Sequence, residues 1–298
     1  MRPTLRQNGF PALNRLWEYH NILEIDGLRK VFEEKVRERT VKLEEKNKAI
    51  IQSIQYASRI QNALLPTGKL FKNHFNDYFI LNKPKEIVSG DFYWVTQVEG
   101  KLIFTIADCT GHGVPGAFLS ILGILLLEQI TCRDKMVEAD MILNTLRERM
   151  NMTMHRKRNG EEIKDGLDLT LCVFDMKENT LQFAGALDRI YRIRNNSLDK
   201  IRPDQMPWNA HMDCDKPCIK YEIGVRPGDI YYLFTDGYPD QFGGEKNKKF
   251  TLKRFQNLLE NIYHKKMNRQ KQILDDTITE WQGPVEQIDD ITVMGIRF

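Results

Sequence analysis

The sequence has few of the features that mark secreted, membrane-spanning or nucleic-acid-binding chains. Its five cysteines are odd in number and scattered, which favours a reducing compartment over a disulfide framework. Its longest apolar run, around residues 121–127, is far shorter than the roughly twenty residues that cross a bilayer. The net charge is only +3, and no basic run is interleaved with aromatic residues, so the sequence offers no argument for a nucleic-acid partner. We therefore expect a cytoplasmic protein without a membrane span or a signal peptide.

Acidic residues stand where predicted strands meet flexible turns, in four separate places. The segments contain Asp91, Asp108, Asp236 and the pair Asp289–Asp290. A carboxylate at such a junction is held rigidly yet stays open to solvent, although an Asp that caps the following helix is the alternative at Asp108. Oxygen ligands of this kind favour Mg²⁺ or Mn²⁺ over zinc. Two such ions a few ångströms apart can activate a bridging water and clamp a phosphoryl group.

Four segments, SGDFYW, ADCTGHGVPGAF, LFTDG and DDITV, carry a resemblance when they are taken together and in this order. They resemble the metal-dependent protein phosphatases of the type 2C (PPM) superfamily, and more closely its bacterial SpoIIE/RsbU branch. The likeness covers roughly residues 54–298. It implies an α+β fold, in which a central β-sandwich is flanked by helices in α/β/β/α layers. The predicted hairpins and the separate helix pairs also suggest such a sandwich.

The resemblance implies roles for individual residues and a mechanism with two Mn²⁺ or Mg²⁺ ions. Asp108 resembles the ligand that both ions share, and the backbone carbonyl of Cys109 completes the first site. Asp236 and Asp289 resemble the remaining side-chain ligands of the second ion. Asp91 resembles the acidic residue that holds the first ion, directly or through water. In the family, a metal-bridging hydroxide attacks the phosphorus of phosphoserine or phosphothreonine without a phosphoenzyme intermediate.

Three further residues near these segments keep open roles. His112 is either a general acid for the leaving hydroxyl or a loop residue satisfied by backbone contacts. Asp290 is interpreted as support either for the turn before the last strand or for the residues that surround the metal ligands. Asp168 lies close to the expected site. No Cys-X5-Arg motif is present, so the sequence does not support cysteine-based phosphatase chemistry.

The N-terminal part has a different pattern. Residues 1–21 are interpreted as a tail or the stub of an upstream region, residues 22–66 as a helical linker, and residues 67–298 as the phosphatase domain. Apolar residues recur every seven positions and mark one seam position of a heptad repeat: Val36, Leu43, Ile50, Ala57 and Leu64. The second seam position is mixed and contains Thr40, Asn47, Ile54 and Gln61. This spacing favours a dimeric coiled coil. A lone helix laid on the phosphatase domain is the alternative, since it needs only one apolar stripe.

These observations lead to one functional hypothesis and one alternative. We expect a homodimeric, metal-dependent serine/threonine phosphatase that acts on a phosphorylated signalling protein such as an anti-sigma-factor antagonist. Its N-terminal helix would receive the signal of an upstream sensor or activator. The alternative is a catalytically silent dimeric adaptor that binds a phosphoprotein through a phosphatase fold. The presence of Asp108, Asp236 and Asp289 argues against the adaptor, because a silent protein would be free to lose them.

Overall fold

The computed structural model describes residues 11–66, 71–72, 75, 77–154, 166–185, 190–201 and 217–298. Contacts divide the chain into two units, residues 1–53 and residues 54–298. The division falls inside one long helix, α1 (Pro11–Leu64). The boundaries proposed from the sequence, at residues 21 and 66, stay predictions.

Two five-stranded antiparallel sheets form the centre of the second unit. We call them the β1 sheet and the β2 sheet, after their edge strands. The β1 sheet has the order β1 (Asp77–Lys83), β12 (Ile291–Arg297), β9 (Ile230–Phe234), β6 (Ile190–Arg194) and β7 (Ser197–Lys200). The β2 sheet has the order β2 (Phe92–Val98), β3 (Lys101–Cys109), β4 (Leu167–Asp175), β5 (Thr180–Gly185) and β8 (Tyr221–Gly224). A two-stranded ribbon, β10 (Phe242–Gly243) with β11 (Lys248–Lys249), lies outside both sheets.

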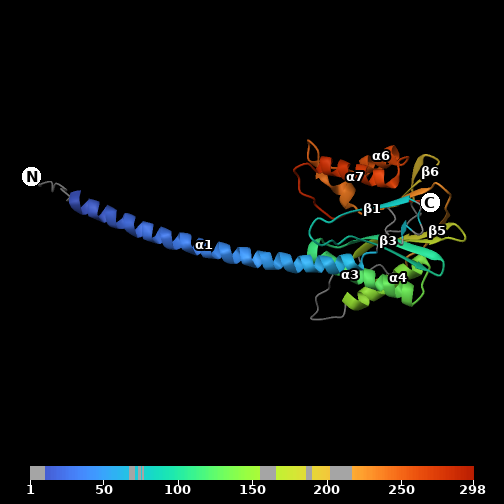
Figure 1. Ribbon diagram of the computed structural model, residues 1–298, viewed down its shortest axis with the longest axis horizontal. Coiled ribbons are helices and arrows are strands. Elements are labelled where there is room, and N and C mark those ends of the chain that lie inside the picture. Colours follow the sequence, from blue (N-terminus) through green and yellow to red (C-terminus); the bar gives the residue numbers. More distant parts are fainter. Residues whose placement is uncertain are drawn as a thin grey trace, which may run out of the picture. The chain divides into compact units, whose positions relative to one another are not determined.

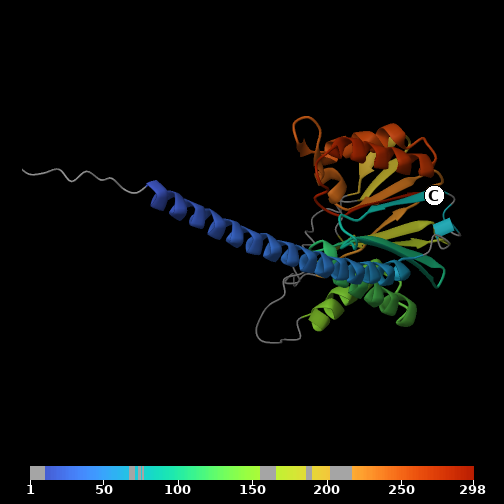
Figure 2. The ribbon, with the colours of Figure 1, turned by 60° about the vertical axis from the view of Figure 1, so that its left-hand side comes forward.

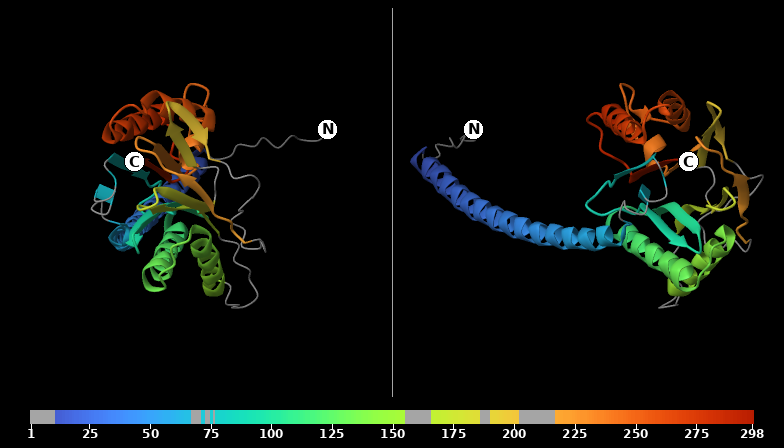
Figure 3. Two further views of the ribbon diagram at one scale, coloured as in Figure 1. Left: turned by 90° about the vertical axis from the view of Figure 1, so that its right-hand side faces the viewer. Right: turned by 45° about the vertical axis from the view of Figure 1, so that its right-hand side comes forward.

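Helices cover the outer face of each sheet (Figures 1 and 3). Helix α3 (Gly113–Glu128), which continues into η1 (Gln129–Arg133), and α4 (Ala139–Met154) lie against the β2 sheet. Helices α6 (Leu252–Ile262) and α7 (Met267–Gln282) lie against the β1 sheet, and the short α5 (Gly237–Asp240) follows β9. The fold is therefore the helix-flanked β-sandwich that the sequence predicted.

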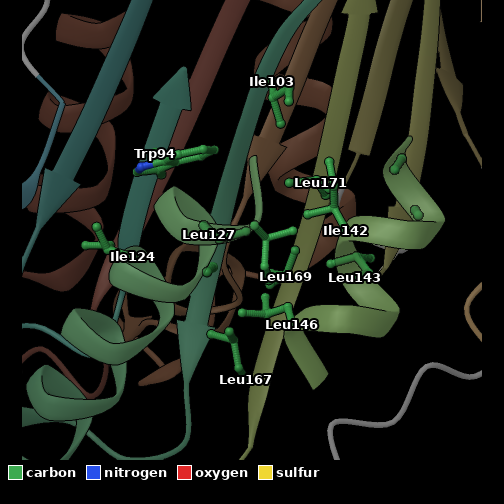
Figure 4. Close-up of a cluster of buried hydrophobic side chains, with 14 of the residues drawn as sticks. Trp94, Ile103, Ile124, Leu127, Ile142, Leu143, Leu146, Leu167, Leu169 and Leu171 are labelled. Atoms are coloured by element: carbon green, nitrogen blue, oxygen red, sulfur yellow. The ribbon is translucent and has the colours of Figure 1, made fainter. Parts of the chain in front are cut away.

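The hydrophobic core consists of three layers, because both faces of each sheet are buried. Along β3, alternate side chains such as Phe104 enter the layer between the sheets, whereas their neighbours such as Ile103 face α3 and α4. Figure 4 shows the helix-side layer, where Leu127 of α3 and Leu146 of α4 pack on Leu169. A strand that is buried on both faces has no polar alternation, which is why β3 and β9 are continuous apolar runs in the sequence.

The apolar helix formed by α3 and η1 is part of this core. By length and composition, Gly113–Arg133 could cross a membrane, yet half of its most apolar window is buried inside the fold. It contacts β2, β3 and α4. Packing between a sheet and a second helix accounts for its hydrophobicity, so this stretch is weak evidence for a membrane span.

Helix α1 is one continuous helix with two different environments (Figure 2). Within residues 26–53 every side chain is exposed, including the predicted seam residues Val36, Leu43 and Ile50. From Ile54 onward, in the second unit, the seam becomes covered: Gln61 is buried and Leu64 packs against the core layer beside the β2 sheet. The last heptad positions therefore pack within the globular unit, as expected for a helix laid on that unit.

An ion-pair cluster around Glu138 ties the start of α4 to the β2 sheet. Its carboxylate accepts hydrogen bonds from Lys101 of β3 (2.8 Å), from Gln182 of β5 (3.1 Å) and from Lys220, which precedes β8. Burial by itself would raise the pKa of Glu138, but the hydrogen bonds from Lys101, Lys220 and Gln182 outweigh it and lower the pKa to about 2. The charged form of Glu138 is thus favoured by folding.

We expect Glu138→Gln to lower the free energy of unfolding by about 2 kcal/mol near pH 7. Because the folded-state pKa is depressed, this stabilisation exists above the ordinary glutamate pKa of 4.5 and disappears as the pH falls toward 2. Urea unfolding of both proteins at several pH values measures the difference. It should shrink below pH 4.5 or so, whereas the exposed control Glu178→Gln should show little effect at any pH. A pH-independent difference would contradict this assignment.

Candidate metal centre

Three aspartates lie at the same end of the β2 sheet. The pairing of β2 with β3 begins at Phe92 opposite Ala107. Asp91, just before β2, and Asp108 of β3 are the next residues beyond this pair. On the other side of β3, Asp108 is paired directly with Asp168 of β4. Side chains directly opposite each other in antiparallel strands share a face, and like charges there are destabilising. Asp168, whose role the sequence left open, is thus a direct neighbour of the proposed shared ligand.

Asp91 is the most deeply buried of the four proposed aspartate ligands, with 4% of its surface exposed. Burial raises the pKa of Asp91 well above its usual range, the negative charge of Asp108 raises it further, and the hydrogen bond from Thr235 opposes both. The Thr235 hydroxyl donates to Oδ2 of Asp91 over 2.7 Å. Thr235 directly follows β9 of the opposite sheet, so this hydrogen bond joins the two sheets at one edge.

Asp236 and Asp289 lie at the corresponding end of the β1 sheet, after β9 and before β12. Burial raises the pKa of Asp289, and the charges of Asp236 and Asp290 add to this effect. The two segments approach closely at Gly237, where an added Cβ would lie 1.9 Å from the carbonyl oxygen of Asp290. Only glycine permits this approach, which explains the Asp-Gly pair that ends the β9 segment.

Asp290 uses both carboxylate oxygens to hold a loop. Its Oδ1 accepts the backbone N–H of Lys85 and its Oδ2 that of Gly90, each over 2.7 Å. The loop in question leads directly into Asp91. The contacts of Asp290 are therefore those of a residue that fixes the position of its neighbours.

Two residues of the glycine-rich turn face the same loop. Nδ1 of the exposed His112 lies 2.7 Å from Oε1 of Glu86. The carbonyl oxygen of Cys109 approaches Gly90, where an added Cβ would lie 3.2 Å from it. Burial raises the pKa of the Cys109 thiol well above its usual range, with Asp108 the next contribution. This cysteine therefore presents a neutral side chain to the core, and only its carbonyl is a candidate ligand.

The donors available here are carboxylate and carbonyl oxygens, and their chemistry fits Mg²⁺ or Mn²⁺. The charge of Asp108 raises the pKa of Asp91, and the charge of Asp236 raises the pKa of Asp289. Within the part of the chain that the structure describes, no three His, Cys, Asp or Glu side chains meet as a closed metal site. The fold thus brings the proposed ligands together as two acidic pairs, which the hydrogen bond from Thr235 to Asp91 connects.

Two antiparallel sheets, each covered by helices, form a sandwich that belongs to the class of PP2C-like phosphatase folds. Within that class, the family model of stage II sporulation protein E (SpoIIE) matches residues 98–298. The chain belongs to the SpoIIE family. This membership supports a phosphatase role, in a family whose members depend on metal ions.

Solved structures show the same fold. The SiaA-PP2C domain of Pseudomonas aeruginosa superposes with a TM-score of 0.75 at 29% identity, covering 85% of this chain and 98% of that one. The phosphatase domain and regulatory fragment of SpoIIE from Bacillus subtilis give a TM-score of 0.59 at 18% identity, covering 74% and 63%. The RsbU and RsbW domains of Rv1364c from Mycobacterium tuberculosis give 0.57 at 16%, covering 74% and 60%. A comparison with curated proteins found no match.

The hydrogen bond between the sheets leads to a stability prediction. Thr235→Val keeps the shape of the side chain but removes the donor to Asp91, so we expect a loss of about 2 kcal/mol in the free energy of unfolding of the metal-free protein. Urea denaturation followed by circular dichroism measures the loss. Thr153→Val, at an exposed position of α4, is the matched control and should change stability by less than about 0.5 kcal/mol. Equal effects of the two substitutions would show that the Thr235 hydroxyl has no special role.

Proposed function

We propose that this protein is a Mn²⁺- or Mg²⁺-dependent serine/threonine phosphatase that acts on a phosphorylated signalling protein. The observation that carries the proposal is the acidic edge of the sandwich, where the buried Asp91 lies beside Asp108 and is tied to the opposite sheet by Thr235. Burial of adjacent carboxylates is costly unless a cation compensates their charge. Such an arrangement is more readily explained by function than by packing.

In this proposal, each residue has a defined task. Asp108 and the carbonyl of Cys109 hold the first ion together with Asp91, and Asp236 and Asp289 hold the second with Asp108. The bound ions would supply an activated water and neutralise the phosphoryl oxygens. The chain keeps Asp91 in place through the hydrogen bonds that Asp290 accepts from the loop before it.

Exposed apolar side chains beside the acidic edge support a protein as the substrate. Ile87 lies in the loop before Asp91, Val114 and Phe118 begin α3 next to His112, and Ile288 directly precedes Asp289. Phe118 is 67% exposed. Exposed apolar groups around a site are typical of protein-binding surfaces and would be superfluous for a small phosphate ester. As the resemblance implies, we propose an anti-sigma-factor antagonist as the substrate class, with a cytoplasmic location.

The exposed half of α1 supports a homodimer as the regulated form. An isolated helix gains little stability in water, and most helices depend on packing of an apolar stripe. In residues 26–53 the stripe is exposed, with Val36 at 46%, Leu43 at 60% and Ile50 at 57%. A second copy of the chain, paired along this stripe, would cover it and could pass on the state of an upstream sensor or activator.

Asp108→Asn and Asp236→Asn test the hydrolase proposal directly. We expect each to reduce Mn²⁺-dependent hydrolysis of p-nitrophenyl phosphate and of a phosphopeptide on the order of 100-fold or more. Mn²⁺ should raise the thermal unfolding midpoint of the wild type but not of these variants. Asp276→Asn, at an exposed position of α7, is the control and should behave as wild type.

Activity that survives both substitutions would reject the ligand assignment. A wild-type protein that binds the phosphopeptide with neither Mn²⁺ binding nor turnover would favour the silent adaptor instead.

Sedimentation velocity tests the dimer. We expect the wild type to sediment as a dimer at micromolar concentration and Leu43→Glu to sediment as a monomer. Burial of an unpaired glutamate charge in the seam between two helices would cost more free energy than the seam provides. Ala49→Glu, one residue from the seam on the outer face, should leave the dimer intact. A monomeric wild type would contradict the dimer proposal while leaving the hydrolase proposal unaffected.

A further inference from the structure

The side-chain amide of Gln61 pairs with both backbone groups of Ser89. Its Nε2 donates to the carbonyl oxygen of Ser89 over 2.6 Å, and the backbone N–H of Ser89 donates to its Oε1 over 3.2 Å. The same Nε2 donates to the hydroxyl of Ser120 on α3 over 2.7 Å. Gln61 is 5% exposed and belongs to the last turns of α1 that lie in the globular unit. Two antiparallel hydrogen bonds to one residue fix that residue as a neighbouring strand would.

The residue that Gln61 holds lies two positions before Asp91. Between them, Gly90 donates its N–H to Asp290 and packs so closely on α3 that a Cβ on Gly116 would lie 2.8 Å from its Cα. Asp91 itself accepts the hydrogen bond from Thr235. The segment 89–91 is therefore held from three elements: Ser89 by α1, Gly90 by the residue before β12, and Asp91 by the residue after β9.

Packing alone does not explain a glutamine at this position. Its neighbours along the same stripe, Ala57 and Leu64, are apolar, and a leucine would fill such a position without polar groups to satisfy. A buried amide costs free energy unless its hydrogen bonds are made. Those of Gln61 go to Ser89 and to Ser120, and thus to the loop that carries Asp91 and to the helix that follows Asp108.

We propose that Gln61 is a positioning residue for the metal centre: it fixes Ser89 and thereby places Asp91 for binding of the first ion. The inference rests on the proposed function and deepens it. It makes the last turns of α1 a part of the site, since the helix reaches the ligand loop through one side chain. Withdrawal of Gln61 from Ser89 would then weaken metal binding without any change in the ligands.

The test uses the full chain with Gln61→Glu and Gln61→Leu. A glutamate can still accept the N–H of Ser89 but cannot donate to its carbonyl oxygen, and a leucine can do neither. We expect Mn²⁺ affinity, measured by titration calorimetry, to fall roughly tenfold in both variants, as for other residues that orient metal ligands. The Mn²⁺ concentration for half-maximal hydrolysis of p-nitrophenyl phosphate should rise by the same factor, while kcat at saturating Mn²⁺ recovers toward wild type. Gln55→Glu and Gln55→Leu, at an exposed position of the same helix, should match wild type.

A double substitution separates positioning from general stability. If Gln61 acts through Asp91, adding Gln61→Glu to Asp91→Asn should change the residual Mn²⁺ affinity less than about twofold, because the group it places is already lost. Circular dichroism melting shows whether each variant folds. Should the Gln61 variants fail to fold, Ser120→Ala removes one partner of the amide and should weaken Mn²⁺ binding by about threefold.

Three results would overturn the inference. They are Mn²⁺ affinity within twofold of wild type in the folded Gln61→Leu variant, an undiminished loss in the Asp91→Asn background, and an unchanged affinity in Ser120→Ala when the Gln61 variants do not fold. A wild-type protein that binds no Mn²⁺ and hydrolyses no phosphate ester would instead reject the proposed function, and this inference with it.

Discussion

The hydrogen bond from Thr235 to Asp91 is the interaction on which the acidic edge depends. It crosses from one sheet to the other, at a point where the surrounding carboxylates repel one another. A buried carboxylate in such a place tends to separate from its neighbours or take up a proton. The hydroxyl of Thr235 and the close glycine contacts oppose the separation of the carboxylates. The sandwich, and not the charges themselves, therefore sets the geometry of the site.

This restraint has a cost that the rest of the fold must offset. Each sheet is apolar on both faces, and three core layers hold the two sheets and the two helix pairs together. Burial of this extent stabilises a framework that can tolerate a few unfavourable charges at its edge. The Glu138 cluster lies elsewhere on the β2 sheet and shows the opposite case, a carboxylate whose partners make its charge favourable. Glu138 is thus satisfied by cations of the chain, whereas the carboxylates of the acidic edge are the ones for which we propose cations from outside.

Much of the fold and part of the site were predictable from local pattern. Continuous apolar runs indicated the doubly buried strands, and the acidic residues after them indicated Asp108 and Asp236 as members of a site. Thr235 and Gln61 did not stand out as partners of these residues, and Asp168 was placed near the site without a role. Their importance comes from strand pairing and helix packing between positions far apart in the chain, such as Asp108 opposite Asp168. Gln61 in particular resembled a weak seam position, because a heptad count cannot tell a polar residue that faces solvent from one that pairs with a distant loop.

The sequence by itself determined the strand-turn-helix segments, their acidic junctions and the long charged helix at the front, because each of these follows from the properties of neighbouring residues. Only the tertiary structure decided which junctions meet, that Asp290 holds a loop, and where α1 ceases to be an exposed helix and becomes part of the globular unit. The physical reason is that hydrogen bonds and charge repulsion act over a few ångströms. Residues some 30 to 200 positions apart in the chain interact only when the sandwich brings them together.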